Sequence, residues 1–264
     1  MNLDLLFDPM FRLPFAVGLL LAIVLPLLGV VLRLRDEWLA ALGLAHLAGA
    51  SGLLGMAVGL PVLLGAPLGA VAGALVKSLA GLGGNTTYGL MILVGWAATL
   101  LVATNTSLGA VIGHALAEGQ LYFTGGLHLV VVAVLAALVA LGLPWLLPHL
   151  LRARLFPGQE IANCLPAWRW HLSFDVLAAL GMAAGAGCLG LMGAFALALV
   201  PPWVAFRVSG NLRHAMLASL LLGLTAYIGG FAAALLLDQP FAPVLVVTLL
   251  VLAGLALPLR RRLG

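Results

Sequence analysis

The sequence carries very little charge: only 8% of its 264 residues are Asp, Glu, Lys or Arg, whereas 64% are hydrophobic. Soluble domains usually have about 25% charged residues, so a mean hydropathy of +1.22 excludes a water-soluble globular protein. The pI of about 9.7 does not indicate a nucleic-acid partner, because no basic stripe is interleaved with aromatic residues. The lipid bilayer is therefore the expected surroundings of the chain.

Catalytic motifs and a disulfide framework are also missing. The sequence contains no H-E-x-x-H, no P-loop and no C-x-x-C, which leaves no motif for nucleotide hydrolysis or for a structural zinc ion. The two cysteines, Cys164 and Cys188, are too few to form a disulfide framework. We therefore expect that the chain is not an enzyme and binds no cofactor of its own.

One short motif still resembles catalytic machinery. The tetrapeptide G-A-S-G at 49–52 is similar to the nucleophile turn of rhomboid-type intramembrane serine proteases. A nucleophilic Ser needs a His within hydrogen-bond reach. His46 precedes Ser51 by five residues on the same predicted helix and points elsewhere, and His214 is predicted near the inner surface. An intramembrane serine protease is kept as an alternative function.

The few basic residues lie in clusters. Eleven of the twelve Lys and Arg fall into five groups separated by long uncharged stretches, Arg12 being the exception. The groups are Arg33 and Arg35; Lys77; Arg152, Arg154 and Arg169; Arg207 and Arg213; and Arg260, Arg261 and Arg262. Because cytoplasmic loops carry the excess of Lys and Arg, these groups predict the cytoplasmic face. The N-terminus is then outside and the C-terminus in the cytoplasm.

The uncharged stretches predict an all-α, polytopic transmembrane bundle of about eight or nine spans that forms a single domain over 1–264. A crossing helix needs about 20 apolar residues. Residues 176–206 are too long for one crossing and short for two, but two crossings that meet near Met192–Gly193 keep Arg207 and Arg213 inside. Pro201 and Pro202 predict a break or kink in the second of them. The predicted spans are 13–32, 38–60, 61–76, 87–103, 127–147, 176–192, 193–206, 216–237 and 241–259.

His46 is the clearest ionisable residue at membrane depth. It lies eight residues after Trp38, which is about 12 Å along a helix. Ionisable groups inside the bilayer are costly, so each is a candidate for substrate contact. The other interpretation is a neutral imidazole that donates to a backbone carbonyl. His114 and His128 flank the outer loop and are weaker candidates, and Asp175 is explained by its place near a helix N-terminus.

The order of these features resembles the membrane permease subunit of the ABC importers for zinc, manganese and iron. The resemblance is in three stretches, VVLRLRDEWLAALGLAHLAGASGLLGMAVGL, CLGLMGAFALALVPPWVAFRVSGNLRHAM and GGFAAALLLDQPFAPVLVV. The first is similar to the family's G-D-x-x-x-H-A element, the second to its V-G-x-x-L…P-A-A-x-A stretch, and the third to its glycine helix and D-x-P-x-G-P turn. The resemblance implies a divalent metal ion as cargo, with zinc first and manganese or iron next.

The resemblance also implies site residues and partners. His46 matches the family's metal-contacting His and Asp238 its outer-turn Asp, but Leu42 stands where the family has the metal-contacting Asp. This departure favours, as the alternative, a permease of the same family for a chelated or non-metal cargo. The stretch 200–216, with Pro201, Arg207, Asn211 and Arg213, would couple the chain to its ATPase.

The implied assembly lies in a bacterial inner membrane. It contains a second copy of this chain, a cytoplasmic dimer of ATP-binding subunits that uses ATP and Mg, and an external solute-binding protein.

Overall fold

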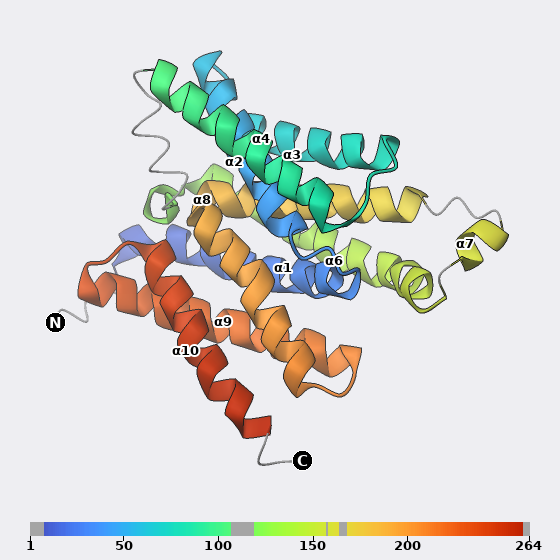
Figure 1. The fold of residues 1–264 in the computed structure, drawn as a ribbon. Coiled ribbons are helices and arrows are strands. Elements are labelled where there is room, and N and C mark those ends of the chain that lie inside the picture. Colours follow the sequence, from blue (N-terminus) through green and yellow to red (C-terminus); the bar gives the residue numbers. More distant parts are fainter. Residues whose placement is uncertain (1–7, 107–118, 157, 164–167, 261–264) are drawn as a thin grey trace.

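The computed structural model describes residues 8–106, 119–156, 158–163 and 168–260, and within them the chain is helical with no strand (Figure 1). This confirms the expected all-α class. Each predicted span corresponds to helix. The elements are η2 (Pro9–Phe11), α1 (Arg12–Leu34), α2 (Ala40–Ala57), α3 (Val62–Leu79), α4 (Gly84–Asn105), η3 (Leu121–Phe123), α6 (Gly126–Leu155), α7 (Gln159–Ala162), α8 (Trp168–Val208), α9 (Leu212–Leu237) and α10 (Phe241–Arg260).

Helix length and composition make the chain a multi-pass membrane protein. Among the described residues, seven helices are long and apolar enough to cross a bilayer, namely α1 to α4, α6, α8 and α9. A shorter apolar helix, Phe241–Leu257, lies within α10. The count of seven takes α8 as one helix. The expected eight or nine spans and the sidedness of the termini therefore stay predictions.

Helix α8 is two helices joined at Gly190. This glycine has φ 80° and ψ 162°, a backbone conformation that residues with a side chain rarely adopt. In Figure 1 the first half of α8 runs from the side of α7, and the second half turns away from that line. The junction expected near Met192–Gly193 is thus at Gly190. The break expected at the prolines was wrong, because the helix continues through Pro201 and Pro202 to Val208.

The centre of the bundle is formed by α1, α2 and α8. Helix α1 packs against α6, α8 and α9, whereas α2 packs against α3, α4 and α8. About two thirds of the most apolar window of α1 and of α2 is buried, but only 28% of that of α4 and of α6. The outer helices therefore present long apolar faces, which is the arrangement expected where lipid replaces water as solvent.

Prolines inside α1 and α8 free carbonyl groups that glycines of neighbouring helices cover. Pro202 has no N–H for the carbonyl of Ala198, one turn earlier. A Cβ built on Gly29 of α1 would lie 2.0 Å from that oxygen. The Gly29 Cα–H therefore points at Ala198 O, a contact that partly satisfies the freed carbonyl. In the same way, a Cβ on Gly223 of α9 would lie 3.1 Å from the carbonyl oxygen of Ala22, which Pro26 frees. Both helix crossings depend on glycine.

The ends of the helices fall on two sides. The end of α1, the end of α3, and the junction of α8 with α9 lie toward the right of Figure 1, whereas the start of α1 and the turn from α9 to α10 lie toward the left. The basic residues of the described chain lie mostly at the right-hand ends, as one cytoplasmic face requires.

Cysteine labelling tests this sidedness. In a variant with Cys164→Ser and Cys188→Ala, a cysteine at Gly210 should react with a membrane-impermeant maleimide only after the cells are opened, since it lies between α8 and α9. A cysteine at Gln239, in the turn before α10, should react in intact cells. Both positions are exposed, so accessibility to the reagent does not limit either reaction. Strong labelling of position 210 in intact cells would contradict two crossings in 176–206.

Candidate functional site

His46 is buried in the middle of α2, between that helix and α4. His46 is 9% exposed, and the centroid of its imidazole ring lies 5.8 Å from the ring centroid of Trp96. Helix α4 comes this close because residue 95 is glycine: a Cβ there would lie 2.7 Å from the carbonyl carbon of His46. The imidazole is thus enclosed between α2 and α4, and the depth in the membrane that the sequence predicts for it stays a prediction.

The imidazole of His46 is held by its own helix. Nδ1 lies 2.9 Å from the carbonyl oxygen of Leu42, one turn earlier. A carbonyl can only accept, so Nδ1 is the donor in this contact, and in a neutral imidazole the lone pair is then on Nε2. The backbone hydrogen bond thus fixes the tautomer whose Nε2 could bind a cation or a polar cargo atom.

His46 has no partner ligands of the expected kind. Within the described ranges, no group of three His, Cys, Asp or Glu side chains could hold a metal ion. Leu42, where the resembling family has an acid, adds no charge one turn away. Zinc sites use three or four N, S or O ligands. His46 therefore forms at most one part of a cation site in a single copy of the chain.

The weaker cargo candidates are His114, His128 and Asp238, of which His128 lines the cavity described below. His114 lies outside the described residues. Asp238 is exposed and ends α9 in the left-handed conformation, with φ 51° and ψ 51°, and its backbone N–H donates to Ala234 O. Asp tolerates this conformation better than most residues. This backbone role explains the side chain's position at the turn.

Ser51 has none of the contacts of a catalytic serine. Its hydroxyl donates to Leu47 O at 2.8 Å, and Oγ also lies 3.3 Å from Ala66 O of α3. A Cβ on Gly69 would lie 2.2 Å from this hydroxyl oxygen. The serine thus joins α2 to α3 through contacts with backbone carbonyls, and among the described residues no histidine lies within hydrogen-bond distance of Oγ. The G-A-S-G tetrapeptide is a helix-packing element.

The stretch 200–216 forms the exposed junction of α8 with α9. Asn211 is the N-cap of α9, where its side chain accepts a hydrogen bond from the backbone N–H of His214 at 2.9 Å. Arg207 lies over the ring of Trp203, with 4.5 Å from its guanidinium carbon to the centroid. Arg207, Asn211 and Arg213 are exposed, whereas Pro201 is buried within α8. Three of the four expected coupling residues are therefore on the surface.

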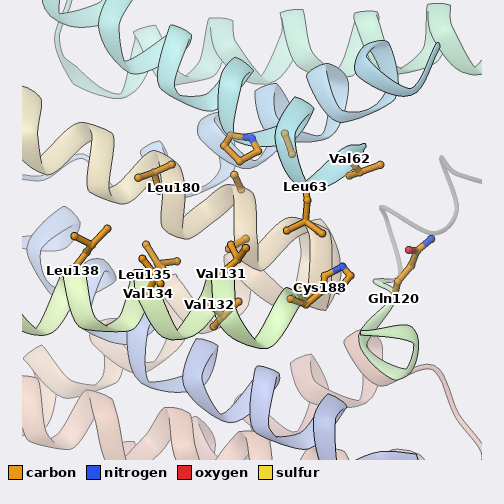
Figure 2. Close-up of a pocket in the computed structure, with 16 residues that line it drawn as sticks. Val62, Leu63, Gln120, Val131, Val132, Val134, Leu135, Leu138, Leu180 and Cys188 are labelled. Atoms are coloured by element: carbon orange, nitrogen blue, oxygen red, sulfur yellow. The ribbon is translucent and has the colours of Figure 1, made fainter. Parts of the chain in front are cut away.

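A cavity of about 230 Å³ lies between α3, α6 and α8 (Figure 2). Its wall is almost entirely aliphatic, with Val131 and Leu135 of α6 facing Leu63 of α3 and Leu180 of α8. Gln120, His128 and Cys188 supply the polar atoms. His46 is not part of this wall.

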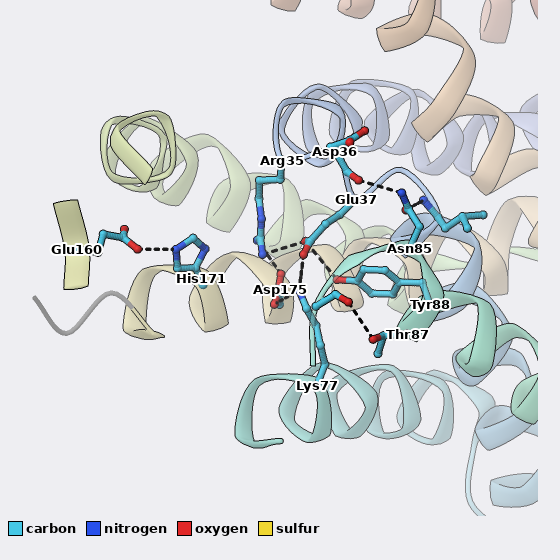
Figure 3. A network of polar contacts seen from close by, with 12 residues as sticks. Arg35, Asp36, Glu37, Lys77, Asn85, Thr87, Tyr88, Glu160, His171 and Asp175 are labelled. Atoms are coloured by element: carbon cyan, nitrogen blue, oxygen red, sulfur yellow. Dashed lines mark hydrogen bonds and ion pairs between the residues drawn. The ribbon is translucent and has the colours of Figure 1, made fainter. Parts of the chain in front are cut away.

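A ring of four buried charges lies where the ends of α1, α3 and α8 meet (Figure 3). Arg35 contacts Glu37 at 2.9 Å and Asp175 at 2.7 Å, and Lys77 contacts the same two carboxylates at 3.0 and 2.9 Å. We call these four residues the charge ring. Sequence reasoning missed it and assigned Asp175 to a helix terminus. No local signal in the sequence pairs these residues, because Arg35 and Asp175 are 140 positions apart.

The fold defines a polytopic helical membrane protein. The chain belongs to the ABC 3 transport family, whose model matches residues 7–259. This confirms the family expected from the sequence and removes the support for a protease. Permeases of this kind are the non-catalytic membrane components of ABC transporters.

Two solved structures share the fold. PsaBC from Streptococcus pneumoniae in complex with Fab has 16% identity and a TM-score of 0.82, and the match covers 96% of this chain and 92% of that one. An inward-facing metal-chelate type ABC transporter has 18% identity and a TM-score of 0.73, covering 97% of this chain and 90% of that one. A search of curated proteins gave no match.

Proposed function

We propose that this chain is the permease subunit of an ATP-driven importer for a divalent metal ion in a bacterial inner membrane, with zinc first and manganese or iron next. The family match over 7–259 is the observation that carries the proposal. A second copy of the chain completes the pathway. A cytoplasmic pair of ATP-binding subunits uses ATP and Mg, and a solute-binding protein delivers cargo from outside.

The junction of α8 with α9 is the proposed contact with the ATP-binding subunit. It is short, capped by Asn211 and carries two exposed arginines, Arg207 and Arg213. Because the first turn of α9 is capped, a displacement at this junction moves α9 without unfolding that turn. Charged residues at the rim of a contact favour the correct docking orientation. Pro201 supports the junction from within α8.

His46 is the proposed cargo contact. Its Nδ1 proton is engaged with Leu42 O, so Nε2 is the atom that would meet the cargo. A single imidazole binds a passing cation weakly, which suits a pathway from which the ion must leave. Two copies of the chain would contribute one imidazole each.

A chelated cargo is the second candidate, and Leu42 is the observation that favours it. With leucine in place of an acid, the helix face beside His46 has no charge to replace the hydration shell of a bare ion. One of the structures that this chain resembles is titled a "putative metal-chelate type ABC transporter". A chelate brings its own ligands, so it needs only shape and a few polar contacts from the pathway.

The two cargoes predict opposite effects of substitutions in α2. If a bare ion is carried, His46→Ala should lower zinc uptake by about tenfold or more, the cost of one good ligand contact. Leu42→Asp should then tighten ion binding, since Asp and His at i and i+4 share a helix face. If a chelate is carried, His46→Ala should have little effect and Leu42→Asp should reduce transport, because an unpaired charge enters an apolar path.

Uptake of radioactive zinc and manganese into vesicles that contain the whole transporter measures these effects. His149→Ala is the matched control, since His149 of α6 makes the same contact with a carbonyl one turn earlier, its Nδ1 lying 3.1 Å from Trp145 O, and this substitution should leave uptake unchanged. Transport of neither ion by the unaltered protein would remove the bare-ion proposal.

A further inference from the structure

The charge ring connects segments that are far apart in the chain. Arg35 ends α1, Glu37 lies in the turn to α2, Lys77 is in the last turn of α3, and Asp175 is in α8. Each carboxylate contacts both cations, so the four ion pairs form a closed circuit (Figure 3). Opening the ends of α1, α3 and α8 apart would break at least two of these pairs at once.

The ring is buried and electrically balanced. The side chains of its four members are between 4% and 12% exposed. Aromatic rings form two of its walls: the Arg35 guanidinium carbon lies 5.2 Å from the centroid of Phe174, and Lys77 Nζ lies 5.1 Å from that of Tyr88. The Tyr88 hydroxyl also donates to Glu37 at 3.4 Å. Charges held in this way are paired strongly while the ring is closed.

Burying four charges is a poor way to gain stability alone. The desolvation cost of buried ion pairs often exceeds their attraction, and apolar side chains of similar size frequently replace them without loss. The neighbouring helices already pack through Gly, Ala and Leu. Buried ionic groups are best attested where they define one arrangement against another, so the ring is better explained as a device that selects a state.

The turn that supplies Glu37 is clamped from α4. Asn85 donates to Asp36 O at 3.0 Å and accepts from the Leu39 N–H at 3.1 Å. Asp36 has a positive φ of 61°, a conformation that non-glycine residues adopt only where the surroundings hold it. The carboxylate of Glu37 is thus presented to the ring by a fixed turn, and α2, which carries His46, begins directly after it.

We propose that the charge ring is a latch: it fastens the inner ends of α1, α3 and α8 in the present conformation and opens when the permease changes state during transport. The proposal rests on the proposed transport function only for the cause of opening. The latch itself is a property of this chain. When it opens, Glu37 is released and the start of α2 is free to shift, which links the ATPase side of the bundle to the helix of His46.

Distances between the inner ends of α3 and α8 test the latch. Leu79 and Trp168 are exposed, at 85% and 59%, and accept spin labels through introduced cysteines in a Cys164→Ser and Cys188→Ala background. The full-length permease, with its ATPase partner in lipid nanodiscs, should give one narrow distance distribution without ATP and a second, longer one with ATP.

The test variant is Lys77→Met with Asp175→Leu, which removes one cation and one anion and keeps the 2.9 Å pair of Arg35 with Glu37. It should populate the longer distance even without ATP, with the ratio of open to closed raised about threefold to thirtyfold. The matched control is Glu160→Gln with His171→Gln, which removes the ion pair beside the ring and should change neither distribution. Arg35→Met with Glu37→Leu, the complementary pair, should repeat the effect.

Identical distributions in the unaltered protein and in a folded double variant would overturn the latch. Failure of both double variants to fold would overturn it as well, since the ring would then be a folding requirement. These measurements need no cargo, so a wrong cargo assignment leaves their result unchanged.

Discussion

Gly29→Ala is expected to prevent the close crossing of α1 and α8 and to leave little folded permease. The new Cβ would lie 2.0 Å from the carbonyl oxygen of Ala198 and 2.8 Å from its carbonyl carbon. These are backbone atoms in the middle of a buried helix, so they cannot move aside as a flexible side chain would. Over-packed cores lose about 1 to 3 kcal/mol and sometimes more, and we expect the upper end here, about 3 kcal/mol.

The crossing also loses a polar contact in this variant. Ala198 O has no N–H partner at Pro202, and the Gly29 Cα–H is the group that faces it. Moving α1 away therefore leaves a carbonyl uncovered at membrane depth, where no water replaces the contact. The steric and polar effects add in the same direction.

Thermal melting of the detergent-solubilised protein, followed by size-exclusion fluorescence, measures this effect. Gly187→Ala is the matched control, because Gly187 lies in α8, the helix that α1 crosses, and a Cβ there meets nothing within 4 Å. Alanine favours helix over glycine by about 1 kcal/mol, so the control should melt at the same temperature or slightly higher. Equal melting temperatures for Gly29→Ala and the unaltered protein would contradict the proposed crossing.

Arg207→Glu together with Arg213→Glu is expected to detach the ATP-binding subunit while the permease stays folded and inserted. Both side chains are exposed, so neither substitution places a charge in the apolar interior. Like charges brought together at a contact cost several kcal/mol, so affinity for the ATPase should fall about a hundredfold or more. The Arg207 side chain also leaves the ring of Trp203, a loss of about 1 kcal/mol at most at an exposed site.

Co-purification of the ATPase with the permease, and ATP hydrolysis stimulated by the binding protein, report the loss. Arg152→Glu with Arg154→Glu is the control, since it reverses two exposed arginines at the end of α6 with the same change in net charge. The control should keep both readouts. Unchanged co-purification of the Arg207 and Arg213 variant would place the coupling contact elsewhere.

The helices could be predicted from the sequence because they follow from local composition. Hydropathy over about 20 residues decides whether a segment crosses lipid, and each predicted span corresponds to helix. His46 lies on α2, well beyond Trp38, and is buried within the bundle. Its hydrogen bond to Leu42 O also follows from local geometry, because residues one turn apart share a helix face.

The interior of α8 shows where local rules fail. Two adjacent prolines predicted a break at 201–202, but the break is at Gly190. A proline frees a carbonyl without stopping a helix when a neighbouring helix covers that carbonyl, and Gly29 does so here. Glycine at 190 tolerates φ 80°, which almost any other residue would resist. Which of these sites bends depends on what packs against it.

The sequence by itself determined the helical class, the positions of the apolar helices and the family, since long apolar runs act through the bilayer wherever the helices lie. Only the tertiary structure decided the partners of the charges. Arg35 and Asp175 are 140 residues apart and Lys77 and Asp175 are 98 apart, so no local pattern could pair them. A charged side chain near a helix end can be solvated by water, bind a lipid headgroup or pair with a buried partner. The packing of α1, α3 and α8 excludes water and brings the four members of the charge ring together.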